Sequence, residues 1–228
     1  MKKTLIALLA IGSLGFADEA ENIYKFTSKT AYGDTNGSAH DGVVFNLGST
    51  TGTTTTITKE GDIPEILLLD SITIQVRNNG AGVSQNTFTL YVMEQETNKV
   101  ISHSTNTILP ATPAAGQKLT FNFDGDELSS ATTYYTRFVP VGQESTAITD
   151  GTYNTSKYWS IPLAAISVTN DGSTAYWGHT QNANTTPTFN NFMPWMEIKT
   201  HSAPVPEPTT GTLSLLALAG LCARRRKH

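Results

Sequence analysis

Apolar and polar residues alternate with a period of two along several stretches of this chain. Four runs show the alternation most clearly, at residues 72–76, 88–92, 119–123 and 134–138. Successive side chains of a strand point to opposite faces, so each run predicts a strand with one face on a core and the other in solvent. The residues predicted to face the core are Ile72, Ile74, Val76, Phe88, Leu90, Val92, Leu119, Phe121, Phe123, Tyr134, Thr136 and Phe138.

Further short stretches rich in β-branched and aromatic residues predict additional strands. They lie at residues 23–27, 43–47, 53–58, 100–104, 165–169, 174–177 and 194–200. Turn-forming pairs separate them: Asn36-Gly37, Asn79-Gly80, Asp124-Gly125, Asp150-Gly151 and Asp171-Gly172. Residues 18–203 show no helical repeat, and about ten short strands of this kind predict an all-β fold, an antiparallel β-sandwich of the jelly-roll type.

The N-terminus has the layout of an export signal. Lys2 and Lys3 precede an apolar stretch at residues 5–16, and Gly15 and Ala17 place small residues before a cleavage point. This pattern predicts a signal peptide at residues 1–17. An N-terminal membrane anchor is the alternative, but the stretch is shorter than the about 20 apolar residues that a span requires.

The C-terminus carries three features in a fixed order. Pro206-Glu207-Pro208 comes first, a short apolar stretch at residues 213–221 follows, and Arg224, Arg225 and Arg226 lie near the end. An apolar helix closed by a basic cluster is typical of a segment held in a membrane with its positive end in the cytoplasm. A simple membrane anchor is one interpretation of this tail.

Together these features resemble the PEP-CTERM sorting signal of exported bacterial proteins, over residues 204–228. The resemblance implies recognition by an exosortase-type membrane transpeptidase, removal of the tail, and delivery to the cell surface or extracellular matrix. It also implies association with exopolysaccharide. The body, residues 18–203, is similar at residues 69–74, 91–93 and 128–135 to the extracellular jelly-roll modules of choice-of-anchor proteins, which implies the same fold and no catalytic residue.

Charge and composition exclude several classes of protein. The chain has 228 residues, of which 15% are charged, against about 25% in an average soluble domain. Cys222 is the single cysteine, so neither a disulfide framework nor a cysteine-rich metal site is possible. The body contains 9 Lys and Arg against 18 Asp and Glu, a net charge of −9, which argues against a nucleic-acid partner.

Motifs for catalysis and metal binding are sparse. The chain has no H-E-x-x-H zinc motif and no G-x-S-x-G nucleophile motif, and it therefore predicts a protein that is not an enzyme. A glycan-active hydrolase remains a hypothesis, because a pair of facing carboxylates has no sequence signature. Asp124, Asp126 and Glu127 are weak candidates for a structural calcium site, with a solvated turn between strands as the alternative.

Aromatic and amide side chains gather in the last third of the body. Aromatic rings cover the apolar face of a sugar, and amides and carboxylates bond to its hydroxyls. The candidate carbohydrate-binding residues are Tyr158, Trp159, Trp177, His179, Asn182 and Trp195. The alternative is that the tryptophans fill the core. The leading hypothesis is a non-catalytic surface or matrix protein, and a lectin-like module is the second.

Overall fold

The computed structural model describes residues 21–27, 39–48, 56–58, 65–76, 86–109, 117–163, 165–167, 178–180 and 192–202. The predicted signal peptide and the predicted sorting tail lie outside these ranges. So do three of the predicted turns, Asn36-Gly37, Asn79-Gly80 and Asp171-Gly172, and the strand predicted at residues 174–177.

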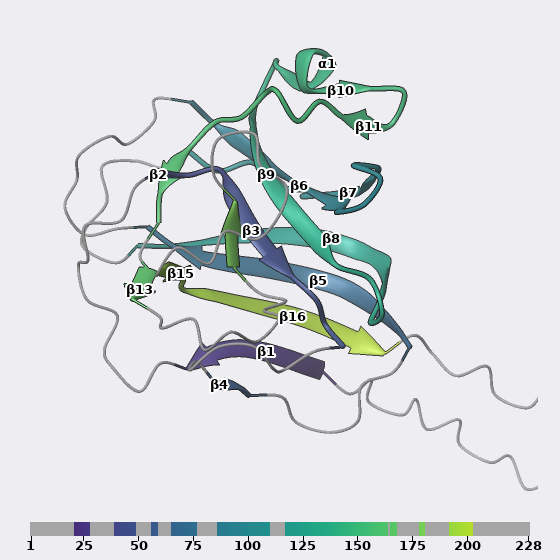
Figure 1. Cartoon of the computed structure of the whole chain (residues 1–228), viewed down its shortest axis with the longest axis vertical. Coiled ribbons are helices and arrows are strands. Elements are labelled where there is room, and N and C mark those ends of the chain that lie inside the picture. Colours follow the sequence, from purple (N-terminus) through teal and green to yellow (C-terminus); the bar gives the residue numbers. More distant parts are fainter. Residues whose placement is uncertain are drawn as a thin grey trace, which may run out of the picture.

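Two five-stranded antiparallel sheets dominate the described residues (Figure 1). The first sheet has the order β4 (Thr56–Thr58), β1 (Glu21–Thr27), β16 (Met196–Ser202), β5 (Ile66–Gln75), β8 (Lys118–Ser129). The second has the order β14 (Gly178–Thr180), β3 (Gly42–Phe45), β9 (Tyr134–Pro140), β6 (Phe88–Glu94), β7 (Val100–His103). The predicted antiparallel all-β class is confirmed, whereas the jelly-roll connectivity stays a prediction.

Three small ladders and one helical turn complete the described elements. The ladders pair β2 (Ala39–His40) with β12 (Ile161–Pro162), β10 (Ile148–Thr149) with β11 (Thr152–Tyr153), and β13 (Ala165–Ser167) with β15 (Phe192–Pro194). The helix, α1, spans Glu144–Ala147. The described residues thus form sixteen strands, more than the about ten expected, because several contain only two or three residues.

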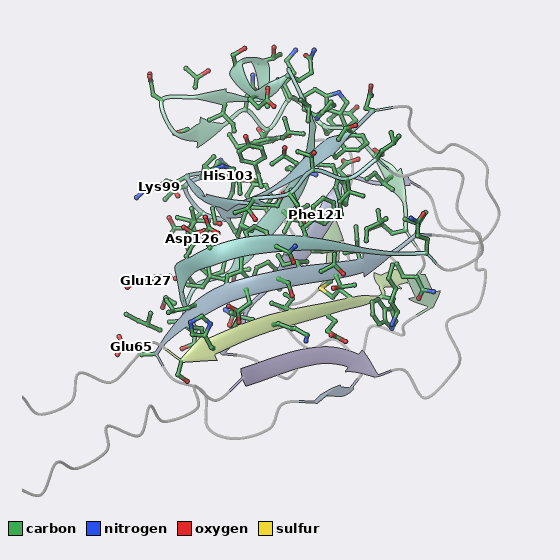
Figure 2. All side chains as sticks on the ribbon, turned by 180° about the vertical axis from the view of Figure 1, so that it is seen from behind. Glu65, Lys99, His103, Phe121, Asp126 and Glu127 are labelled. Atoms are coloured by element: carbon green, nitrogen blue, oxygen red, sulfur yellow. The ribbon has the colours of Figure 1, made fainter. Side chains whose placement is uncertain are left out.

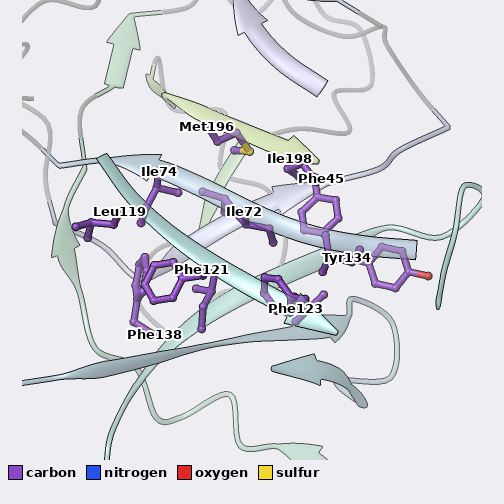
Figure 3. Close-up of a cluster of buried hydrophobic side chains, with 14 of the residues drawn as sticks. Phe45, Ile72, Ile74, Leu119, Phe121, Phe123, Tyr134, Phe138, Met196 and Ile198 are labelled. Carbon is purple, nitrogen blue, oxygen red and sulfur yellow. The ribbon is translucent and has the colours of Figure 1, made fainter. Parts of the chain in front are cut away.

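The main hydrophobic core is shared by the two sheets. Figure 3 shows Ile72, Phe121 and Ile198 of the first sheet meeting Phe45 and Phe138 of the second. Every residue predicted to face the core is buried. Burial of one large apolar side chain stabilises the fold by about 1.5–3 kcal/mol relative to exposure, so this shared core is what holds the two sheets together.

A β-bulge interrupts the alternation in the middle of the first sheet. Along β5 the buried apolar positions are Leu67 and Leu69 before Asp70, and Ile72 and Ile74 after it. The register of β5 shifts at this point against both β8 and β16. A shift of one residue would turn every following side chain to the other face. The bulge absorbs the shift, and both halves of β5 keep their apolar side chains on the core.

The same bulge accounts for the Asp124-Gly125 pair, for which the expectation of a turn between strands is wrong. Both residues lie within β8, opposite Asp70, where three residues of β8 face one residue of β5. Gly125 has a φ of +77°, which a residue with a side chain adopts only at a cost. The glycine therefore forms a bulge and not a chain reversal.

Three strands of the second sheet, β3, β9 and β6, are covered on both faces, which corrects the expectation that one face of each strand is in solvent. All residues of β9 are buried, including Tyr135 and Arg137 between the core positions. A second apolar cluster explains this, because Tyr135, Tyr91 and Val139 pack against Ala147 and Tyr153 of the segment 141–160. Figure 1 shows α1, β10 and β11 of this cap segment above β9 and β6.

The predicted turn at Asp150-Gly151 is confirmed within the cap segment. It joins β10 and β11 as a two-residue hairpin, and both residues have positive φ, 49° and 72°. Positive φ at both positions defines the tight turn that suits the twist of a hairpin. The turn then anchors the cap, because the Gly151 carbonyl accepts a hydrogen bond from the amide of Val100, at 2.8 Å.

Candidate functional site

The outer face of the first sheet is hollowed into a shallow trough of about 490 Å³. This outer trough lies on the face opposite the core, across β16, β5 and β8, the broad ribbons in front in Figure 2. Its lining side chains are Asp70, Ser71, Thr73, Lys118, Thr120, Asn122, Trp195, Glu197 and Lys199. Most of these residues are polar and alternate along their strands with residues of the core, and Trp195 directly precedes β16.

The trough is hollow because the central strand carries short side chains, while β16 on one side and Lys118 on the other carry long ones. Ser71 and Thr73 lie on β5, while Trp195, Glu197 and Lys199 follow β16. Thr73 is opposite Glu197 in one direction and opposite Thr120 in the other. The hydroxyls of Thr73 and Thr120 hydrogen-bond to each other at 2.9 Å, so they form a fixed polar floor.

One end of the trough is an aromatic ring with a cation on its face. The Lys118 ammonium lies 4.2 Å from the centroid of the Trp195 ring. The two residues belong to opposite sides of β5, and their long side chains meet across the Gln75 position, whose amide donates to the Trp195 carbonyl at 3.4 Å. Lys118 is exposed and Trp195 is partly buried, so this cation–π contact remains open to solvent.

The other end of the trough is an acid–imidazole pair at the bulge. Asp70 Oδ1 and His201 Nδ1 are 2.7 Å apart, and the two side chains are 37% and 22% exposed. Asp70 is the residue at which β5 loses register with both neighbours. The alternation that starts from Leu67 and Leu69 already places Asp70 on the outer face, and the bulge adds Ser71 to that face before Ile72 returns to the core.

The trough combines the groups that bind sugars in proteins. The Trp195 ring offers a flat apolar surface, and the threonine hydroxyls, the Asn122 amide and the charged groups offer hydrogen bonds. All of these groups except Trp195 itself lie on paired strands, and Trp195 directly precedes β16. Strands hold binding groups more rigidly than loops do.

The structure distributes the predicted carbohydrate-binding residues over different parts of the molecule. Trp195 lines the trough, whereas Tyr158 is exposed at the end of the cap segment and the partly buried Trp159 packs against both apolar clusters. His179 lies in β14, at the edge of the second sheet, and its side chain is not described. Trp177 and Asn182 lie outside the described residues. Carbohydrate binding by these residues stays a prediction.

Most of the trough residues were not singled out by the sequence. Thr120 and Asn122 are the polar members of a run whose apolar members were predicted correctly, and Lys118 directly precedes that run. The alternation assigns them to an outer face but does not reveal which strands are neighbours. Only the order β16, β5, β8 brings Trp195 to Lys118.

The three calcium candidates do not converge in the structure. Asp126 and Glu127 are successive residues of β8, and successive side chains of a strand point to opposite faces. The Asp126 carboxylate accepts a hydrogen bond from the Ser102 hydroxyl, where β7 and β8 meet near the labelled His103 (Figure 2). Among the described residues, no three His, Cys, Asp or Glu side chains are grouped to hold a metal.

The described part of the chain contains no helix long and apolar enough to cross a membrane. The sorting tail, for which such a helix was predicted, lies outside these residues.

Comparison with known proteins identifies one end of the chain and not the body. No curated protein and no solved structure matches the chain. Residues 204–227 match the model of the PEP-CTERM protein-sorting motif, and this range contains the whole predicted sorting signal: Pro206, Glu207, Pro208, Arg224, Arg225 and Arg226. The motif is recognised by exosortase-type enzymes, so the chain carries the sorting signal of a protein exported to the cell envelope or surface.

Proposed function

We propose that this protein is a non-catalytic surface protein that holds extracellular polysaccharide in the outer trough. The carrying observation is the position of Trp195, which is partly buried at the end of a hollow lined with hydroxyl, amide and charged side chains. The sorting motif supports the location, because a protein at the cell surface meets polysaccharide there.

The shape of the trough favours an internal stretch of a chain over a single bound sugar. The lining residues follow β16 from Trp195 to Lys199, which corresponds to about 13 Å at the usual rise of a strand. The hollow crosses three strands and is open along its length. A polymer can therefore enter and leave it without threading, which suits a protein that retains a matrix polysaccharide.

A non-catalytic role is part of this proposal. The polar floor consists of Ser71, Thr73 and Thr120, and the Thr73 and Thr120 hydroxyls are hydrogen-bonded to each other. Among the lining residues that the structure describes, neither threonine has an adjacent histidine base, and the His201 ring is engaged with Asp70 at the other end. Such a floor binds and orients sugar hydroxyls but does not activate a nucleophile.

The proposal is tested by screening the full-length protein on a broad glycan array and measuring each hit by calorimetry. We expect Trp195→Ala to weaken binding by roughly tenfold, since an aromatic stacking contact is worth about 0.5–1.5 kcal/mol beyond the burial of its area. Tyr158→Ala is the matched control, because Tyr158 is an exposed aromatic residue outside the trough. It should bind as the unaltered protein does.

Two results would overturn the proposal. One is the absence of any glycan ligand for the folded protein, and the other is a ligand whose affinity is unchanged by Trp195→Ala. A ligand lost in Tyr158→Ala instead would move the site to the cap segment. The appearance of new reducing ends during incubation with the bound glycan would contradict the non-catalytic role.

A further inference from the structure

We infer that the outer trough selects acidic polysaccharides, with the carboxylate of a uronic acid on Lys118 and the sugar ring on Trp195. This inference rests on the proposed function and adds the chemical class of the ligand to it. The evidence is the contact between Lys118 and Trp195, the charge of the trough and the charge of the surrounding protein.

The Lys118 ammonium occupies the ring face that a sugar would use. It lies 4.2 Å from the Trp195 centroid, within the range of a cation–π interaction. A neutral sugar that stacks on this face must displace the ammonium and offers no charge in return. Lys118 therefore acts against neutral ligands at this end of the trough.

A sugar that carries a carboxylate changes the role of Lys118 from competitor to partner. The lysine head sits on a flexible four-carbon stem and can move from the ring face to an incoming carboxylate. The resulting charge-assisted hydrogen bond replaces the cation–π contact while the ring becomes free for stacking. Because Lys118 is exposed, this movement requires no rearrangement of the core.

The charge of the surrounding protein makes the trough the favourable place for a polyanion. The body carries a net charge of −9 and repels acidic polymers over most of its surface. The trough, however, is lined by two lysines, Lys118 and Lys199, and two acids, Asp70 and Glu197, so its formal charge is balanced. The Asp70 carboxylate is in addition engaged by the His201 ring, at 2.7 Å.

The matched pair of probes is polygalacturonate and its methyl ester, which share a backbone and differ in the charge of the carboxyl group. We expect the full-length protein to bind the acid form roughly tenfold more tightly, the size of one charge-assisted contact. Lys118→Gln should abolish this preference, and by freeing the ring it should leave binding of the ester equal or stronger. Lys118→Arg keeps the charge and should keep the preference.

Lys157→Gln is the control for general loss of positive charge, since Lys157 is an exposed lysine of the cap segment, outside the trough. It should leave the preference unchanged. Equal affinity for acid and ester, or a preference that survives Lys118→Gln, would overturn the inference. If the ester still bound through Trp195, the proposed function would stand without it. If neither polymer nor any glycan of the array bound, the inference and the proposed function would both be wrong.

Discussion

The Arg137 guanidinium lies 3.4 Å from the Asp41 carboxylate, and both side chains are completely buried beneath the cap segment. Burial lowers the pKa of Arg137, and the negative charge of Asp41 acts against this shift. Ser160, at the end of the cap segment, donates a hydrogen bond to the same carboxylate. The pair thus connects the start of β3, the middle of β9 and the cap.

Removal of one partner of this buried pair should be costly. Asp41→Asn leaves the arginine charge uncompensated, and Arg137→Met leaves the carboxylate uncompensated, so each should lower the free energy of unfolding by about 3–5 kcal/mol. The double variant should lose clearly less than the sum. The measurement is a double-mutant cycle from urea unfolding curves, and additive losses would show that the two charges do not interact.

Stability should fall as the pH rises above about 10. Burial raises the pKa of Tyr135 from its ordinary value near 10 to about 12, with Arg137 acting against it, and burial raises the pKa of Tyr153 as well. In this range the unfolded chain has lost phenolic protons that the folded chain keeps, so alkali favours unfolding. Tyr135 alone contributes roughly 3 kcal/mol that disappears between pH 10 and pH 12.

Urea unfolding at pH 8, 10 and 11 measures this dependence. Tyr135→Phe should flatten it, at the cost of about 1 kcal/mol at pH 8 from the lost hydrogen bond to Asn98. Tyr158→Phe serves as the control, because that side chain is exposed. An equally steep fall in Tyr135→Phe would show that other groups cause it.

Asn106 should protect the outer edge of the first sheet. Its Nδ2 donates to the Thr120 carbonyl at 2.9 Å, and its Oδ1 accepts from the Asn122 amide at 2.8 Å, so the side chain replaces a neighbouring strand on β8. Asn106→Ala exposes this edge to pairing with other chains. We expect a loss of about 1–2 kcal/mol and self-association at high protein concentration.

Sedimentation velocity over a concentration series detects such self-association. Thr105→Ala is a suitable control, because the contact of the Thr105 hydroxyl to the same strand is longer, at 3.3 Å. A monomeric Asn106→Ala protein at all concentrations would assign the edge protection to other residues.

Gly42 should tolerate no side chain. A Cβ atom at this position would lie 1.9 Å from the Thr136 carbonyl oxygen, which belongs to the neighbouring strand β9. Gly42→Ala should therefore separate β3 from β9. This should lower the free energy of unfolding by several kcal/mol, and the melting temperature should fall sharply. Gly151→Ala is the informative comparison, since no described residue beyond its chain neighbours lies within 4 Å of its Cβ position, and a backbone penalty of about 1 kcal/mol is expected. Equal melting temperatures for the two variants would contradict this account.

The sequence predicted the core-facing residues of the strands better than the burial of the residues between them. Leu119, Phe121 and Phe123 were correctly assigned to the core because a period of two is a local property of the chain. Burial of Arg137 and Tyr135 could not be predicted in this way, since it depends on a cap segment that returns from later in the chain. The Asp124-Gly125 pair resembles a turn locally and is a bulge only because β5 passes beside it.

The candidate site likewise contains one residue that the sequence predicted and others that it did not. Trp195 was predicted as a sugar-binding residue from its type and its polar neighbours, and the structure places it in a trough. Lys118 and Thr73 were not predicted, because their proximity to Trp195 arises from strand order. Strand order in an antiparallel sheet depends on long-range packing that a single sequence does not display.

The position of β16 has a mechanical consequence. This strand lies between β1 and β5 and ends at Ser202, immediately before the sorting motif at residues 204–227. A force applied between the C-terminal end and the rest of the fold pulls β16 lengthwise. Because ladder hydrogen bonds run perpendicular to the strands, such tension loads the bonds on both sides of β16 simultaneously, in shear. The sheet that carries the trough is thereby also the part of the fold that resists such tension.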